Sequence, residues 1–237
     1  MRIGILMSNT DESAFADAHP RDGEKWRTAL APFCPGCTFP VYSVKDGQFP
    51  DHVGDHDGFV ITGSPASVHD LDPWLPRLFA LIREAHDAGV PLFGACFGHQ
   101  AIALALGGAV EKNPGGWVLG VTETDVVAPA PWMQAGPILQ HAAHVEQVAR
   151  LPEGAEVTMT NADCPNGGFT IGTSVFTTQY HPEISRDFII ALIEYLADEM
   201  PPEVILTARE SLVEAADNGP FRRWIMTFFR QAQMNSA

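Results

Sequence analysis

The sequence predicts an α/β fold built around a mostly parallel sheet. Three nearly continuous apolar runs, residues 2–7, 58–63 and 90–95, are typical of strands that are buried on both faces. A segment with apolar residues at helical spacing lies between the last two runs, so that strand, helix and strand follow one another. This order predicts that the two strands pair in parallel through a right-handed crossover.

The first half of the chain begins with predicted strands. Residues 2–7 form the first, residues 41–44 form a second that the turn sequence KDGQFP closes, and residues 58–63 form a third. The helix that follows has one apolar face, made by Trp74, Leu78, Ile82 and Ala85. This helix ends at Gly89, and residues 90–95 then form a fourth strand.

The middle of the chain has a different character. Between residues 109 and 180 the sequence consists of short β-like runs separated by turns. The clearest of them are residues 117–127, 156–161 and 174–180. Helices return from about Arg186.

The C-terminal segment predicts two further helices. One is initiated by the prolines at 201 and 202, and a break is expected at Gly219-Pro220. The last helix has an apolar face made by Phe221, Trp224, Ile225, Phe228 and Phe229. Core packing explains this face better than a dimer or partner surface does. We therefore expect one α/β domain in which helices of residues 199–237 pack on the body formed by residues 1–198.

The composition excludes several classes of protein. Hydrophobic residues make up 46% and charged residues 18%, as in ordinary globular proteins. The formal net charge of −15 argues against a nucleic-acid partner, because phosphate binding depends on Lys and Arg. The first apolar stretch is too short for a secretory signal and no run is long enough to span a bilayer, so we expect no membrane partner.

The four cysteines predict a reducing compartment. Because no export signal is recognised, we expect thiols rather than disulfides and a cytoplasmic location. Cys34 and Cys37 form the sequence CPGC, a spacing that is compatible with a redox pair or with half of a zinc site. No second CxxC or nearby histidine pair completes a zinc site, so we expect no metal and no special role for this pair.

Cys96 lies where the strand 90–95 ends and a helix begins, between Gly94 and Gly98. A nucleophile on a sharp strand-to-helix turn is lifted towards the substrate, and the crowded backbone there requires small flanking residues. The first amides of the helix favour thiolate over thiol and can also hold an oxyanion. The pattern therefore favours a nucleophilic cysteine over a small buried cysteine beside tightly packed glycines.

A base for this cysteine is expected in the sequence TTQYHPEIS, residues 177–185. His181 lies at another predicted strand end and can take the thiol proton and later give it to a leaving amine. Glu183 follows after one proline and can bond the other imidazole nitrogen, which fixes the tautomer. His-Pro-Glu alone is weak evidence, but together with the cysteine turn it indicates a hydrolytic site.

These stretches resemble the class I glutamine amidotransferases. The matching segments are residues 61–67, 94–100, 141–156 and 179–185, which occur in the order of that family. The resemblance covers about residues 40–195 and implies a flavodoxin-like three-layer α/β sandwich with a C-terminal helical extension. The C-terminal helices are similar to those of stand-alone members of the GMP-synthase-like branch, which includes the plant γ-glutamyl peptidases.

The resemblance also implies roles for individual residues. Cys96 would be the nucleophile, His181 the base and acid, and Glu183 the residue that orients His181. The backbone N–H groups of Phe97 and Ser64 would hold the oxyanion. Many members of the family have a second glycine where this chain has Ser64 after Gly63, and serine does not adopt a positive φ cheaply, so this loop departs from the family pattern.

Further residues are implied on the substrate side of the site. Gln100, one helical turn after Cys96, would contact the bound glutamine. Backbone groups around Val145 and Glu146 would hold its α-amino-acid end. For His144, a structural role and a contact with substrate are equally open.

The implied reaction is attack of the thiolate on the γ-carbonyl carbon of glutamine or another γ-glutamyl small molecule. A γ-glutamyl thioester forms, ammonia or an amine leaves, and water hydrolyses the thioester, with no metal or organic cofactor. Two enzyme hypotheses stay open: an amidotransferase subunit that passes ammonia to a separate synthetase, and a self-sufficient γ-glutamyl peptidase. A catalytically silent binding or regulatory protein is the third hypothesis, and a homodimer is a further partnership that the sequence leaves open.

Overall fold

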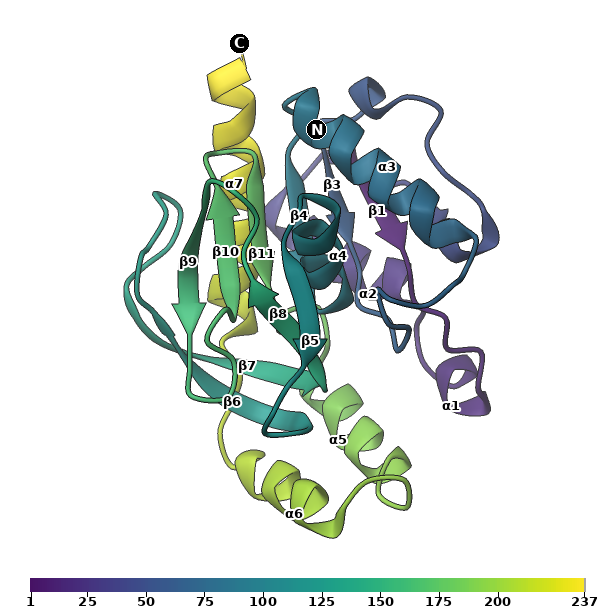
Figure 1. Cartoon of the computed structure of the whole chain (residues 1–237), viewed down its shortest axis with the longest axis vertical. Coiled ribbons are helices and arrows are strands. Elements are labelled where there is room, and N and C mark those ends of the chain that lie inside the picture. Colours follow the sequence, from purple (N-terminus) through teal and green to yellow (C-terminus); the bar gives the residue numbers. More distant parts are fainter. Residues whose placement is uncertain (237) are drawn as a thin grey trace.

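The parallel half of the sheet is made by the apolar runs that the sequence predicts. Its strands are β1 (Ile3–Met7), β2 (Val41–Ser43), β3 (Gly58–Ile61), β4 (Leu92–Ala95) and β11 (Val175–Thr178). In the computed structural model, which describes residues 1–236 and the side chains of residues 1–234, they lie in the order β2-β1-β3-β4-β11 (Figure 1). Each pair of neighbours is parallel. This strand order is the flavodoxin-like one, as predicted.

An antiparallel half continues the same sheet beyond β11. Its strands are β6 (Val118–Val126), β7 (Gly136–His144), β9 (Ala155–Thr160) and β10 (Gly168–Ile171), in the order β10-β9-β6-β7. A separate pair is formed by β5 (Ala109–Lys112) and β8 (Glu146–Arg150). The sequence predicted β6, β9 and β11 but not β5, β7, β8 or β10, whose short or polar segments carry no continuous apolar run.

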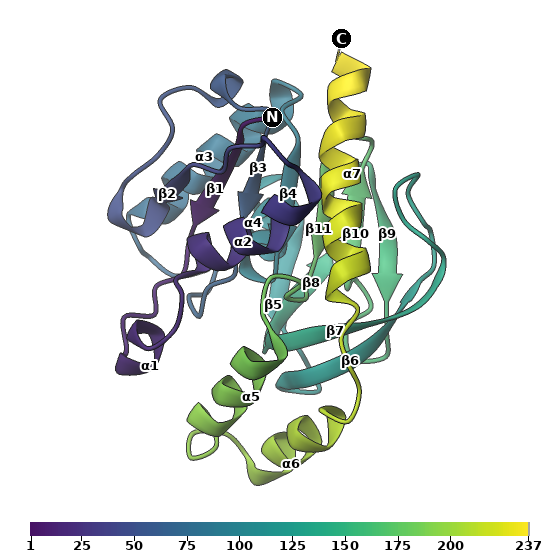
Figure 2. The same ribbon diagram turned by 180° about the vertical axis from the view of Figure 1, so that it is seen from behind.

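Helices cover both faces of the sheet and complete the three layers. α3 (Trp74–Asp87) and α4 (Phe97–Ala105) lie on one face, while α2 (Asp22–Leu30) and α7 (Asn218–Ser236) lie on the other (Figures 1 and 2). The predicted apolar face of α3 is buried in the cluster on the first face. Trp26 of α2 and the aromatic face of α7 are buried in the cluster on the second face. The aromatic residues of α7 therefore serve the core, as core packing predicted.

Three further helices lie beside the carboxyl ends of the parallel strands or beside the antiparallel half. They are α1 (Ala14–Asp17), α5 (Arg186–Tyr195) and α6 (Pro202–Ser211). The expected break at Gly219-Pro220 is wrong by a few residues, because both residues lie in the first turn of α7. Proline is tolerated there, since the N–H groups of a first helical turn have no intrahelical acceptor.

Short 3₁₀ helices occupy Ala31–Phe33, Val44–Asp46 and Val53–Asp55. Within residues 1–236, no helix has both the length and the apolar character that crossing a bilayer requires.

The cysteines differ from the expectation of four thiols. Cys34 and Cys37 form a disulfide, with Cα atoms 5.5 Å apart. The physical reason is local: a turn follows the 3₁₀ helix, closed by the Cys37 N–H donating to the Cys34 carbonyl oxygen at 3.0 Å, and it brings the two side chains within disulfide range. Cys96 and Cys164 are free and buried. The cytoplasmic location expected from the cysteines stays a prediction.

Candidate active site

The carboxyl ends of three neighbouring parallel strands bring distant parts of the chain together. β3, β4 and β11 lie side by side, so the segments that follow them emerge at one edge of the sheet. Gly63 follows β3, Cys96 follows β4 and His181 follows β11. This edge is where open α/β sheets bind their ligands.

Cys96 adopts the strained backbone that the turn requires. Its φ of 50° and ψ of −110° make it the only non-glycine residue with a positive φ in the described part of the chain. Strain of this kind costs about 1–3 kcal/mol and recurs at functional sites. A β-carbon on Gly94 would lie 2.5 Å from the Gly98 carbonyl oxygen, and one on Gly98 would collide with the Ile61 carbonyl oxygen. The flanking glycines are therefore required by close backbone approach.

The sulfur of Cys96 lies at the start of α4. The residue is 5% exposed, and its Sγ lies 3.9 Å from the Ala143 carbonyl oxygen. Phe97 is the first residue of α4, so its N–H has no acceptor within the helix and points, with the helix dipole, to the same end. The cysteine therefore lies at the end of α4 where N–H groups have no intrahelical acceptor.

His181 is held by Glu183 and lies against Gly63 together with Cys96. Its Nδ1 is 2.8 Å from Glu183 Oε1, and the two side chains are 12% and 2% exposed. With Nδ1–H donating to the carboxylate, Nε2 is left as an acceptor, and it has no hydrogen-bond partner among the described residues. A β-carbon on Gly63 would lie 2.8 Å from His181 Cε1 and 3.7 Å from Cys96 Cβ, so only glycine lets the ring approach the cysteine.

Charge decides the protonation of His181. Burial lowers its pKa, but the adjacent Cys96 thiolate and the Glu183 carboxylate outweigh burial and hold the pKa well above its ordinary value. At three other histidines nearby burial prevails, even though Glu183 also acts on His141. Burial lowers the pKa of His141 and His144 to about 4 and that of His99 to about 3. The arrangement can therefore hold an imidazolium beside a thiolate at His181 alone among these four histidines.

Ser64 lies in the wall of the same cavity as Cys96 and His181. Its φ is not positive, and its Oγ accepts a hydrogen bond from the Ala66 N–H at 3.1 Å. The loop after β3 therefore accommodates serine where many family members carry glycine, without left-handed backbone at this position.

Gln100, Val145 and Glu146 do not line the cavity that contains Cys96. Gln100 Nε2 donates to the Glu146 carbonyl oxygen at 2.8 Å and to Gln179 Oε1 at 3.2 Å. The Val145 carbonyl oxygen accepts from the Asn113 N–H at 2.7 Å. In this arrangement Gln100 supports the backbone at Glu146, and its contact with substrate stays a prediction.

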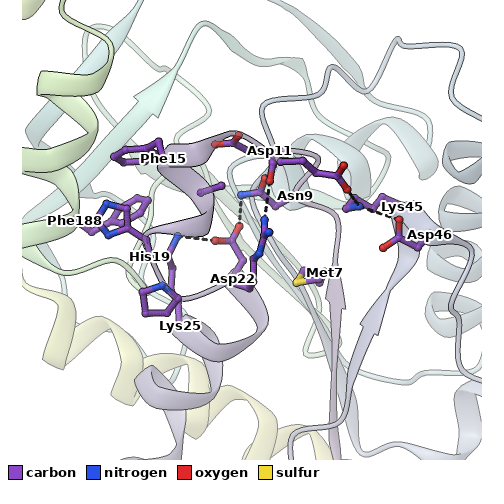
Figure 3. Close-up of a pocket in the computed structure, with 14 residues that line it drawn as sticks. Met7, Asn9, Asp11, Phe15, His19, Asp22, Lys25, Lys45, Asp46 and Phe188 are labelled. Atoms are coloured by element: carbon purple, nitrogen blue, oxygen red, sulfur yellow. Dashed lines mark hydrogen bonds and ion pairs between the residues drawn. The ribbon is translucent and has the colours of Figure 1, made fainter.

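The cavity at Cys96 has a volume of about 330 Å³ and extends beyond the residues that the sequence singled out. It is lined by Gly63, Ser64, Cys96, His181 and Glu183, and also by residues from the segment after β1 and from α5. A second cavity of about 260 Å³ adjoins it (Figure 3). The two share Asn9, Asp11, Phe15, Asp22, Lys25 and Phe188.

Sequence reasoning missed this shared wall. Asn9 and Asp11 directly follow β1, so the rule that ligands bind at the carboxyl ends of parallel strands could have found them. Lys25 and Phe188 carry no such signal. Among the residues that the structure describes, no three His, Cys, Asp or Glu side chains gather as ligands for a metal ion.

A profile of the family described as glutamine amidotransferase class-I matches residues 36–187, well over half of the chain. The chain belongs to the class-I glutamine amidotransferase family. This confirms the resemblance predicted from its four sequence stretches.

Two relatives of this chain are matched over different shares of their own length. Gamma-glutamyl peptidase 3 of Arabidopsis thaliana is 26% identical over 192 residues, which cover 77% of this chain and 72% of the peptidase. The glutamine-hydrolysing GMP synthase of Leifsonia xyli subsp. xyli is 35% identical over 137 residues, which cover 54% of this chain and 26% of the synthase.

Solved structures confirm the amidotransferase fold. A glutamine amidotransferase from Thermotoga maritima superposes with a TM-score of 0.73 at 20% identity, covering 96% of this chain and 97% of that one. A glutamine amidotransferase from Methylobacillus flagellatus gives a TM-score of 0.73 at 20% identity, covering 98% and 94%. At this identity the likeness establishes the α/β class and nothing finer.

Proposed function

We propose that this amidotransferase-family protein hydrolyses γ-glutamyl amides by covalent catalysis through Cys96. The observation that carries the proposal is the meeting, in one cavity, of a strained strand-end cysteine and an imidazole bonded to Glu183. The raised pKa of His181 supports an imidazolium–thiolate pair, the form in which a cysteine nucleophile is active.

The reaction begins when His181 Nε2 takes the proton of the Cys96 thiol. The thiolate attacks the γ-carbonyl carbon, and the new oxyanion is held by the N–H groups of Phe97 and Ser64. A donor of this kind typically lowers the barrier by about 3 kcal/mol. Glu183 accepts the Nδ1–H bond throughout, which fixes the ring and stabilises its positive charge.

The reaction ends in two proton transfers through the same ring. As the C–N bond breaks, His181 gives its proton to the leaving nitrogen, and ammonia or an amine departs. Water, deprotonated by His181, then attacks the γ-glutamyl thioester, and the C–S bond breaks to release glutamate and leave the Cys96 thiolate beside the His181 imidazolium. No step of this sequence requires a metal or an organic cofactor.

We propose a self-sufficient peptidase rather than an obligate synthetase subunit. The γ-glutamyl peptidase relative is matched over 72% of its length, and the cavity at Cys96 continues past the triad residues into space that ammonia would not need. The amidotransferase-subunit hypothesis is supported by the GMP synthase relative, of which the match covers 26%. In that case a separate synthetase would accept the ammonia.

The test is to trap the thioester over a panel of glutamine, glutathione and γ-glutamyl dipeptides. The purified chain is acid-quenched during turnover and its peptides are analysed by mass spectrometry. We expect a γ-glutamyl adduct on the peptide that contains Cys96, with faster turnover of dipeptides than of glutamine. Turnover that survives in Cys96→Ala would refute covalent catalysis. Glutaminase activity that rises only when a co-purifying synthetase is added would favour the subunit hypothesis over the peptidase.

A further inference from the structure

The wall shared by the two cavities carries one cation. Lys25, from the first turn of α2, is the only Lys or Arg among the described residues that line the Cys96 cavity. The chain as a whole has a formal net charge of −15, so the charge of Lys25 is opposite in sign to the net charge of the protein.

Lys25 is fixed in place by its neighbours. Its Nζ lies 2.8 Å from Asp22 Oδ1 and 3.6 Å from the centroid of the Phe188 ring (Figure 3). Asp22 Oδ2 accepts a hydrogen bond from Asn9 Nδ2 at 2.7 Å, so both carboxylate oxygens of Asp22 are engaged. The Lys25 and Asp22 side chains are only 12% and 7% exposed. A partly buried cation of this kind keeps a fixed direction towards the cavity.

The donors of Lys25 are not all used within the protein. An ammonium group has three N–H donors, and Asp22 is the one hydrogen-bond acceptor that Lys25 has among the described residues. Asp11 and Glu199 line the same cavity without a cation partner in the described chain. An incoming carboxylate is therefore repelled near those two residues and attracted at Lys25.

Apolar side chains line the same cavity as this cation. Phe15 stacks on Tyr195 with ring centroids 4.5 Å apart and lies 5.7 Å from Phe188. Ile184 and Leu192 belong to the apolar part of the same cavity wall. A ligand that fills this space combines a carboxylate with an apolar group, which is the chemistry of an apolar α-amino acid.

The position of His181 indicates which part of the substrate reaches this wall. In the proposed reaction His181 protonates the leaving nitrogen, so groups attached to that nitrogen lie on the His181 side of the cavity. The chain runs from His181 through Ile184 to Phe188, and Lys25 packs on Phe188. Lys25 therefore lies in the wall of the cavity that would receive the leaving group.

We propose that Lys25 binds the carboxylate of the leaving group, so that the preferred substrates are γ-glutamyl derivatives of apolar α-amino acids. This rests on the proposed hydrolysis of γ-glutamyl amides and specifies its substrate class. Lys25 is a binding residue in this proposal, Asp22 and Asn9 fix its position, and Phe188 and Phe15 contact the apolar side chain of the leaving amino acid.

The test compares kcat/KM for three probes. γ-Glutamylleucine carries both carboxylates, γ-glutamylleucinamide lacks the leaving-group carboxylate, and 4-aminobutyrylleucine lacks the α-carboxylate of the glutamyl group. We expect γ-glutamylleucine to be preferred over its amide by about tenfold, mainly through KM, as for one charge-assisted hydrogen-bonded contact. In Lys25→Met, which keeps the apolar stem on Phe188, this ratio falls to about one.

Two further variants serve as controls for this comparison of kcat/KM. Because Lys25→Met leaves Asp22 without its cation, the double variant Asp22→Asn/Lys25→Met provides a second protein in which no buried charge is unpaired. Lys45→Met is the matched control, because Lys45 bonds Glu12 and Asp46 at the adjoining cavity but does not line the Cys96 cavity. Its preference for γ-glutamylleucine should equal that of the wild type.

Several results would overturn the inference. A ratio that is unchanged in both Lys25 variants would remove Lys25 from substrate binding. If Lys25→Met instead loses the preference for γ-glutamylleucine over 4-aminobutyrylleucine, Lys25 is assigned to the glutamyl carboxylate. Binding of the same probes to Cys96→Ala, measured by calorimetry, tests the carboxylate contact without catalysis. If no γ-glutamyl compound is cleaved, the proposed function fails, while equal binding of γ-glutamylleucine and its amide to Cys96→Ala would overturn only the carboxylate site.

Discussion

Two regions of this protein use the same kinds of side chain to opposite effect. At the strand ends, His181 lies between Cys96 and Glu183, and its pKa is raised well above the ordinary value. In the interior, burial raises the pKa of the Cys164 thiol to about 12 and lowers that of His99 to about 3. Burial opposes the charge on both histidines. The difference is that His99 Nδ1 meets only the Thr177 hydroxyl, at 2.8 Å, whereas His181 meets two groups that carry negative charge.

A buried thiol or imidazole stays neutral unless opposite charges beside it outweigh the cost of burial. The residue type is therefore weak evidence for function, and the charged partner is strong evidence.

The largest expected effect separates the two free cysteines. Cys96→Ala should lower kcat/KM for γ-glutamyl substrates by about 10⁴-fold or more, because it removes the nucleophile. Cys164→Ala should leave kcat/KM close to the wild-type value, because that thiol is 1% exposed and held in its neutral form. Both variants are compared by steady-state kinetics after their folding is checked by thermal unfolding. Equal losses in the two variants would end the distinction between the regions.

A smaller effect is expected when the partner of His181 is neutralised. Glu183→Gln should lower kcat by about 10²-fold, because Gln does not stabilise the imidazolium as the carboxylate does. Glu183 raises the pKa of His181, so its removal lowers that pKa, and the alkaline limb of the pH–rate profile should move to lower pH. Glu194→Gln is a matched control, since Glu194 forms an exposed ion pair with Arg209. An unmoved alkaline limb would contradict the assignment of the charge partner.

The smallest effect concerns stability and His99. Its folded-state pKa of about 3 lies below the ordinary value of 6.5, so only the unfolded chain binds a proton between these values. The stability that follows is complete above about pH 6.5 and is lost as the pH falls towards 3. His99→Gln should make the free energy of unfolding less dependent on pH in this range, by up to about 1.4 kcal/mol per pH unit. Urea unfolding at several pH values measures this slope, and an unchanged slope would show that His99 is not kept neutral by burial.

The sequence predicts an element correctly where the residues of that one segment decide its conformation. The strands β1, β3 and β4 and the helix α3 follow from local apolar patterns, which act within each segment. The segments β5, β7, β8 and β10 carry no such pattern, and pairing with other strands decides their conformation. The disulfide between Cys34 and Cys37 was not predicted although its cause is local, because the expectation of thiols rested on the cellular compartment and not on the turn that follows the 3₁₀ helix.

For the site, the same division holds residue by residue. Cys96 between two glycines, and His181 followed by Glu183, are local signals that strand ends and close packing explain. The hydrogen bond from the Gln100 amide to the Glu146 backbone is not revealed by spacing along one helix, and contact of Gln100 with substrate stays a prediction.

Local sequence patterns account for the α/β class, the strained turn at Cys96 and the pairing of His181 with Glu183, because each depends on residues close together in the chain. That Asn9, Lys25 and Phe188 line the same cavity as Cys96 follows from tertiary packing alone. These residues come from the loop after β1, from α2 and from α5, and no local preference links them. The packing of α2 and α5 beside the strand ends brings them together, because a ligand cavity is formed by surfaces that meet only when the whole chain has folded.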